Sequence, residues 1–373
     1  MSYSISEKIL RFIQTVPMAE LDDTAFNDLA LELFQHQFEM NTVYRGICNR
    51  SNVLPNHFTD WREIPAVTTS AFKEVPLTCF PAHEAAAVFH TSGTTQHRPG
   101  KHYFRTLNYY RAAMLRSFAA HGLDNENDKM RMFFLGPTLE FFPNSSLGYM
   151  FSGLRDEFGD EKSAVFFSPQ HIDAPGLQRA LETATQENAP VFILGTALAL
   201  LEAMEVFQQQ NRKFKLPFGS RILDTGGYKS RRVEITREEF QNRLCEIFGV
   251  PREYLLNEYG MTELSSQFYD SPLIDFDRRD RKLATMPSAP RPLHAVPPWV
   301  RIAAVDPENL NILPEGEAGL LRIFDLANVD SVMAIQTADV GSAWENRLEL
   351  VGRAGGAELR GCSLLTETSV HAA

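Results

Sequence analysis

Residues 91–95, Thr-Ser-Gly-Thr-Thr, gather small hydroxyl side chains around one glycine, and the polar run continues to Lys101. Glycine lets the main chain approach a ligand closely, while hydroxyl and backbone N–H groups donate hydrogen bonds to anions. This composition suits a loop that holds the phosphates of a nucleotide. It is also typical of a solvent-exposed Ser/Thr-rich turn, which is the simpler interpretation of the loop taken alone.

The loop does not follow the pattern of a P-loop nucleotide-binding site. That pattern has four residues between its glycines and a Ser or Thr directly after the lysine. Here six residues separate Gly93 from Gly100, and His102 follows Lys101. The sequence therefore disfavours a kinase or a P-loop NTPase.

Several polar segments resemble, in type and order, the motifs of one enzyme superfamily. Residues 91–101 resemble the phosphate loop of the adenylate-forming acyl-CoA synthetases, luciferases and adenylation domains. Residues 257–263, Asn-Glu-Tyr-Gly-Met-Thr-Glu, resemble their Tyr-Gly-x-Thr-Glu core motif. Residues 337–341 resemble the Thr-Gly-Asp-x-Gly motif, with Ala338 in place of its glycine, and residues 352–353 resemble the Gly-Arg hinge. Three further segments narrow the resemblance to the acyl-protein synthetase branch, which activates fatty acids in bacterial bioluminescence: residues 144–147, 223–230 and 360–364.

The resemblance implies an α/β fold with a layered αβαβα core and a small, distorted β-barrel subdomain. Residues 1–350 would form the N-terminal domain of the superfamily, with the core at about 60–285 and the barrel at about 286–350. Residues 351–373 would be a vestigial hinge and tail. Members of the superfamily continue with a mobile lid domain that carries a catalytic lysine. Because only twenty residues follow Arg353, we expect no full lid domain here.

The reaction implied by the resemblance is attack of a carboxylate on the α-phosphate of ATP, which gives an acyl-adenylate and pyrophosphate. Glu263 would bind Mg²⁺, because a hard oxygen ligand suits a cation that bridges phosphates. The resemblance assigns ATP binding to the phosphate loop (Thr91, Ser92, Gly93, Thr94, Thr95), to the adenine side (Gly226, Gly227, Tyr259), to the core motif (Gly260, Thr262) and to the ribose side (Asp339, Arg353).

Several of these residues also have a purely structural interpretation. Tyr259 could be a core side chain, and Gly226 and Gly227 could form an ordinary turn. Glu263 could be a surface carboxylate at the start of a helix. A salt bridge at the hinge explains Arg353 as well as a contact with ATP does.

Two further residues are candidates for catalysis. Lys229 follows the Gly-Gly pair and is the first candidate for the charge that a lid lysine would supply, ahead of Lys101, Arg231 and Arg232; a solvated loop residue is the default interpretation. The Arg-Gly-Cys-Ser-Leu setting of Cys362 resembles that of the acylated cysteine in acyl-protein synthetases. A thiolate is a strong nucleophile toward an acyl-adenylate, and Arg360 could lower its pKa. An inert tail thiol is the alternative.

Composition fits a cytoplasmic enzyme with a large core. The chain has 373 residues, 44% of them hydrophobic, and a net charge of −11. An acidic chain lacks the positive field that nucleic acids and anionic membranes attract, so we expect neither as a partner. The four cysteines are widely spaced, which favours reduced thiols over disulfides or a zinc site. We expect no signal peptide and no membrane span.

Hydrophobic patterning predicts the elements that must position these residues. A capping box at Ser4 and Glu7 opens a helix, and residues 22–46 are expected to form another. Alternating strands and helices predict a layered α/β core with ligands at the carboxyl ends of its strands. The core strands are expected at residues 130–135, 191–194, 221–223 and 254–256, the helix after the second strand at 197–209, and antiparallel strands at 300–302, 319–324 and 348–351.

The sequence therefore predicts an ATP-dependent ligase that activates a hydrophobic or aromatic carboxylic acid and passes the acyl group to a thiol, a reductase or another acceptor. Aromatic residues around Gly136 and Gly148 fit a fatty or an aromatic acid, although core packing explains them equally well: Phe133, Phe134, Phe141, Phe142 and Tyr149. The resemblance reaches enzymes of both substrate types, including some that activate aromatic carboxylates in secondary metabolism, such as antibiotic biosynthesis. The alternatives are a non-catalytic or partner-dependent nucleotide- or acyl-binding subunit and one half of a split ligase.

Overall fold

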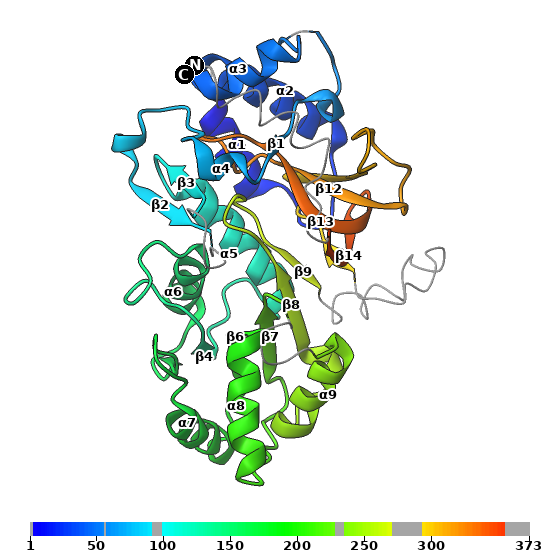
Figure 1. Ribbon diagram of the computed structural model, residues 1–373. Coiled ribbons are helices and arrows are strands. Elements are labelled where there is room, and N and C mark those ends of the chain that lie inside the picture. The colour runs from blue at the N-terminus through cyan, green and yellow to red at the C-terminus, as the bar shows by residue number, and fades with distance from the viewer. Residues whose placement is uncertain (1–2, 56, 92–98, 228–234, 271–292, 355–373) are drawn as a thin grey trace. The chain divides into compact units, whose positions relative to one another are not determined.

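The computed structural model describes residues 3–55, 57–91, 99–227, 235–270 and 293–354, which fall into two compact units (Figure 1). Unit 1 contains the described residues up to Ser117, the segment Met261–Gln267 and the described residues from Leu293 on. Unit 2 contains Phe118–Gly260 and the segment that starts at Phe268. Both units are discontinuous in sequence, and the core motif at residues 257–263 contributes residues to each.

Unit 2 is built on a mostly parallel sheet. Its strand order is β9-β8-β7-β6-β4-β5, and only β9 is antiparallel to its neighbour. The strands are β4 (Arg131–Leu135), β5 (Ala164–Val165), β6 (Val191–Thr196), β7 (Arg221–Thr225), β8 (Leu255–Tyr259) and β9 (Phe268–Asp270). Every residue of β4 and β7 is buried, as expected for parallel strands covered on both faces.

Helices cover both faces of this sheet. Successive strand residues point to opposite sides, so neighbouring residues pack against different helices. Phe133 of β4 belongs to the core that α7 (Ala174–Gln186), α8 (Ala197–Gln209) and α9 (Arg237–Phe248) form on one face (Figure 1). The next residue, Phe134, contacts Phe151 of α6 (Ser146–Phe158) on the other. The chain crosses from one face to the other between α6 and α7, since β5 and β6 lie on either side of β4. In open α/β sheets, ligands bind at such a reversal, outside the carboxyl ends of the strands.

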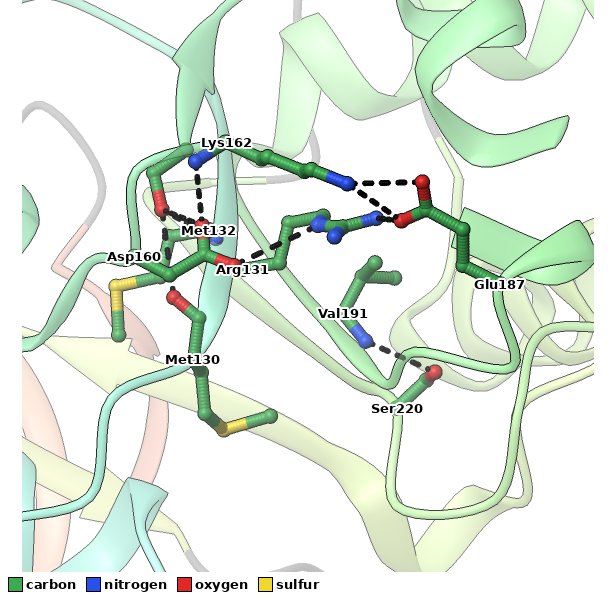
Figure 2. A network of polar contacts seen from close by, with 9 residues as sticks. Met130, Arg131, Met132, Asp160, Lys162, Glu187, Val191 and Ser220 are labelled. Atoms are coloured by element: carbon green, nitrogen blue, oxygen red, sulfur yellow. Dashed lines mark hydrogen bonds and ion pairs between the residues drawn. The ribbon is translucent and has the colours of Figure 1, made fainter. Parts of the chain in front are cut away.

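The opposite, amino-terminal end of the sheet is fixed by an ion-pair network (Figure 2). Arg131, the first residue of β4, is 2.8 Å from Glu187 through Nη1 and 3.6 Å from Asp160 through Nε. Lys162 Nζ is also 2.8 Å from Glu187. The network ties β4 to the end of α7 and to the turn before β5. It lies at the end of the sheet opposite to the carboxyl ends of the strands.

Unit 1 is built on an antiparallel sheet in the order β11-β12-β13-β14-β10, with β1 added in parallel to β13. These strands are β11 (Val300–Val305), β12 (Ala318–Asp325), β13 (Ala334–Trp344), β14 (Arg347–Arg353), β10 (His294–Ala295) and β1 (Val67–Thr68). A separate hairpin consists of β2 (Ala87–His90) and β3 (Lys101–Phe104). The antiparallel strands predicted at 300–302, 319–324 and 348–351 are thereby confirmed.

The predicted helices agree with the structure, and one helical segment is divided in two. The remaining helices are α1 (Ile5–Thr15), α2 (Asp23–Met40), α3 (Thr42–Arg50), α4 (Ala71–Glu74) and α5 (Asn108–Gly122), with short 3₁₀ turns at Trp61–Glu63, Ala82–Glu84 and Arg252–Tyr254. The capping box at Ser4 and Glu7 is present. The helical structure expected over 22–46 is confirmed and consists of two helices, because α2 ends at Met40 and the side chain of Asn41 accepts a hydrogen bond from Tyr44 N and starts α3. Among the described helices none is both long and apolar enough to cross a membrane.

Candidate active site

The hairpin β2–β3 closes the base of the hydroxyl-rich loop. Thr91 N donates to Gly100 O at 3.0 Å, and Gly100 N donates back to Thr91 Oγ1 at 2.9 Å. The next pair along the hairpin is His90 opposite Lys101. Ser92, Gly93, Thr94 and Thr95 lie outside the described residues. The structure thus defines both ends of the loop that the sequence assigns to phosphates.

Thr262 of the core motif is attached to this hairpin. His102 Nδ1 donates to the main-chain oxygen of Thr262 at 2.9 Å, and Thr262 Oγ1 donates to His90 O at 3.5 Å. Burial lowers the pKa of His102 to about 4, so its ring is neutral at physiological pH. Because a carbonyl oxygen only accepts, the ring proton must be on Nδ1. His102 was not among the predicted site residues, because it is one residue of a four-residue strand and belongs to no motif.

Glu263 follows Thr262 and is the centre of a group of charges within unit 1. Its side chain is buried, and burial raises its pKa. The positive charges of Arg353 and Lys73 act in the opposite direction, and the negative charge of Asp339 adds to the effect of burial. Asp339 and Arg353 lie more than seventy residues after Glu263 in the sequence, yet their charges act on its carboxyl group.

Asp339 and Arg353 are opposite each other on β13 and β14. Arg353 Nε is 3.1 Å from Asp339 Oδ1, with side-chain exposures of 71% and 13%. The register of the two strands shifts between Val340 and Gly341, where a Cβ on the glycine would be 2.2 Å from a main-chain oxygen of β14. Only glycine fits this bulge. The salt bridge that was the structural alternative for Arg353 is present. Its partner is Asp339, the predicted ribose ligand.

A buried polar cluster holds the segment that carries Glu263. Asn328 Nδ2 donates to Glu263 O at 2.9 Å, and Ser265 Oγ donates to Asn328 Oδ1 at 2.7 Å. Asp325 accepts from Ser265 N at 2.9 Å and from Ser266 Oγ at 2.8 Å. Burial raises the pKa of Asp325 to about 6. Asp325 and Asn328 were not among the predicted site residues, although two polar residues after the apolar run of β12 were a usable signal.

In unit 2, the predicted adenine residues follow two neighbouring strands. Gly226 comes directly after β7 and has φ +85°, a conformation that favours glycine. Gly226, Gly227 and Gly260 are exposed. The ring of Tyr259, the last residue of β8, is tilted against Phe268 with centroids 5.6 Å apart. Thr225 and Glu258 are paired across β7 and β8, so both segments emerge at the same sheet edge. Lys229 and Cys362 lie outside the described residues.

Glu258 is a buried carboxyl group just before Tyr259. It accepts a hydrogen bond from Thr225 Oγ1, and burial raises its pKa to about 7. The nearby negative charge of Asp224 acts in the same direction. The ordinary value is 4.5, so the folded protein keeps a proton on Glu258 over a pH range in which the unfolded chain has lost it.

We expect this proton to make stability depend on pH. Between about pH 4.5 and 7 the native state binds more protons at Glu258 than the unfolded state does, so the free energy of unfolding should fall as pH rises. Glu258→Gln should remove part of this fall, as measured by urea unfolding at pH 5, 6, 7 and 8. Glu253→Gln, the same change at an exposed position, is the control. Equal pH dependence in both variants and the parent would contradict the assignment.

The chain is similar to one protein family and to two ligases of luminous bacteria. Residues 176–370 match the family described as acyl-protein synthetase, LuxE. A long-chain-fatty-acid–luciferin-component ligase of Vibrio harveyi is 23% identical over 344 residues, which cover 89% of this chain and 84% of that protein. The ligase of the same name from Aliivibrio fischeri is 24% identical over 383 residues, 94% of each chain.

Solved structures show the same fold. A 2-hydroxyisobutyryl-CoA ligase in complex with 2-HIB-AMP and CoA, in an open conformation, superposes with a TM-score of 0.61 at 16% identity. That match covers 94% of this chain and 73% of the ligase. The same ligase in its postadenylation state with R3-HIB-AMP gives a TM-score of 0.63 at 15% identity, over 92% and 70% of the two chains. The predicted α/β fold of adenylate-forming type is confirmed.

Proposed function

This chain belongs to the LuxE family of acyl-protein synthetases, and we propose that it converts a fatty acid and ATP into an acyl-adenylate and pyrophosphate. The family makes the chain an ATP-dependent, carboxylate-activating ligase. The fatty acid is the substrate class in the names of both luciferin-component ligases. One observation supports the site above all others: within unit 1, Glu263 is attached through Thr262 to the hydroxyl-loop hairpin and is in electrostatic reach of Asp339 and Arg353.

In the proposed reaction, an oxygen of the substrate carboxylate attacks the α-phosphorus of ATP. A new P–O bond forms, the bond between the α-phosphorus and the bridging oxygen breaks, and its electron pair leaves with pyrophosphate. The loop based on Thr91 and Gly100 would hold the β- and γ-phosphates. Asp339 would accept hydrogen bonds from the ribose hydroxyls, and Arg353 would orient its carboxylate.

The residues around Glu263 fit a magnesium ion bound together with nucleotide phosphates. Mg²⁺ is commonly held by one or two carboxylates plus phosphate oxygens rather than by an all-protein cage. Glu263 offers one buried carboxylate, and no group of three or more His, Cys, Asp or Glu side chains able to hold a metal occurs among the described residues. When bound, Mg²⁺ would supply positive charge to the phosphates. Glu263 would be its protein ligand.

The adenine is proposed to lie against Gly226 and Gly227, with Tyr259 and Gly260 from the neighbouring strand. No described atom lies within 4 Å of a Cβ placed on Gly227. Gly227→Ala should therefore leave the thermal unfolding temperature unchanged and weaken ATP binding, because the added methyl would occupy the space of the base. Titration calorimetry with ATP measures the effect. Gly46→Ala, which also adds a methyl with no described atom within 4 Å, is the control; equal ATP affinity in both variants would contradict the adenine site.

Carboxylate-dependent ATP–pyrophosphate exchange with Mg²⁺ tests the proposed function. The panel should contain short, medium and long fatty acids beside aromatic acids of matched hydrophobicity. Exchange confined to fatty acids supports the proposal, and exchange confined to aromatic acids would replace its substrate class. ATP binding without exchange for any acid would instead favour a partner-dependent or non-catalytic subunit.

For the step after adenylation, we propose transfer of the acyl group to Cys362 and then to a reductase or another acceptor. Lys229 is proposed to offset charge at the α-phosphate. Full exchange activity in Lys229→Ala would refute that role.

A further inference from the structure

The short helix α4 is held close to the strand that carries Asp339. It follows β1, whose residues Val67 and Thr68 pair in parallel with Ile335 and Gln336 of β13. Thr69 N then donates to the main-chain oxygen of Gln336 at 3.2 Å. A stretch near residue 70 is thus fixed beside a strand more than 260 residues further along the chain.

The side chains of α4 contact the base of the hydroxyl loop. Phe72 packs edge-on against His102, with ring centroids 5.5 Å apart, and so against the residue that holds Thr262. The Cγ of Lys73 is 3.5 Å from the position that a Cβ on Gly100 would take. The aliphatic stem of Lys73 therefore lies over the point where the chain leaves the loop and enters β3.

Lys73 brings a positive charge to this place. It is exposed, and within the described part of the chain it has no ion-pair partner. Its stem meets Gly100, whose N–H donates to Thr91 Oγ1 at the base of the hydroxyl loop. Arg353 is already paired with Asp339, whereas the ammonium group of Lys73 is available to a ligand. Lysine carries a compact ammonium charge on a flexible aliphatic stem, which suits an anion that arrives with the substrate.

We propose that Lys73 binds the phosphates of ATP beside Thr91 and Gly100 and stabilises the negative charge on pyrophosphate as it leaves. This inference rests on the proposed function and adds a catalytic residue to it. The ammonium group keeps its proton throughout. It neutralises the electron pair that the broken P–O bond leaves on the β-phosphate oxygen.

Nucleotide binding separates this role from a structural one. Lys73→Met should weaken ATP binding by roughly 10- to 100-fold, the range for a hydrogen bond to a charged group, and leave AMP binding unchanged, because AMP lacks the β- and γ-phosphates. Lys73→Arg should restore most of the ATP affinity. The matched control is Lys213→Met, which removes the same charge from an exposed ion pair with Glu246 in unit 2. Titration calorimetry gives both affinities, and thermal unfolding confirms that each variant is folded.

The outcomes are distinct. Unchanged ATP affinity in Lys73→Met, or an equal loss for ATP and AMP, would overturn the role of Lys73 while exchange activity of the parent protein keeps the proposed function intact. A parent protein that neither binds ATP nor catalyses exchange with any acid would overturn both. A selective loss of ATP affinity, restored by arginine, supports Lys73 as the phosphate ligand.

Discussion

Replacing Glu263 with glutamine is expected to lower carboxylate-dependent ATP–pyrophosphate exchange by about 10²- to 10³-fold, the usual cost of removing one group that stabilises transition-state charge. The carboxylate is buried beside the loop hairpin, where the low dielectric strengthens its interaction with a cation. An amide of the same shape keeps the packing and loses the charge. The exchange rate at saturating ATP, measured over a range of Mg²⁺ concentrations, gives the effect.

The variant also has an expected stability. Because burial raises the pKa of Glu263, the neutral amide should fold at least as well as the carboxylate. Glu317→Gln makes the same substitution at an exposed site in unit 1 and should leave exchange unchanged. Exchange in Glu263→Gln within a few-fold of the parent, at every Mg²⁺ concentration, would exclude Glu263 as the metal ligand.

Cys362→Ser is expected to abolish the covalent acyl-enzyme and to leave ATP–pyrophosphate exchange intact. In the proposed step, the thiolate attacks the acyl carbon of the adenylate, a C–S bond forms, and the C–O bond to AMP breaks. The described cysteines are poor substitutes. Burial raises the pKa of Cys48 and of Cys79 to about 12, so both remain protonated, and it also raises the pKa of Cys245.

Intact mass spectrometry after incubation with ATP, Mg²⁺ and the preferred acid measures the adduct. The parent protein should gain the mass of one acyl group, and hydroxylamine should remove it, as expected for a thioester. Cys245→Ser, at the most accessible of the described cysteines, is the matched control and should be acylated like the parent. An undiminished adduct in Cys362→Ser would place the acyl group elsewhere.

The helices, the strands and the enzyme class could be predicted from the sequence alone. A short apolar run predicted β6, the helical pattern after it located α8 to the residue, and the capping box predicted the start of α1. These signals are local, because a strand or a helix end depends on neighbouring residues. The motif order, from the hydroxyl loop to Asp339, led to the superfamily, and the family match confirms that resemblance.

Local patterns also have a limit, as residues 22–46 show. Both α2 and α3 have helical periodicity, and the break between them depends on a side-chain cap by Asn41. The same residue accepts from Tyr44 N and donates to Ser331 O, almost three hundred residues away. A contact of that range leaves no periodic trace in the sequence.

The neighbours of Glu263 could not be predicted from the sequence and are known from the three-dimensional fold. Lys73 comes near because β1 pairs with β13, His102 because its ring donates to Thr262, and Asn328 because it accepts from Ser265 while donating to Glu263. None of these residues belongs to a motif. The physical reason is that a motif contains the residues that contact the ligand. The residues that position these side chains, or change the charge around them, are brought close by long-range strand pairing and burial.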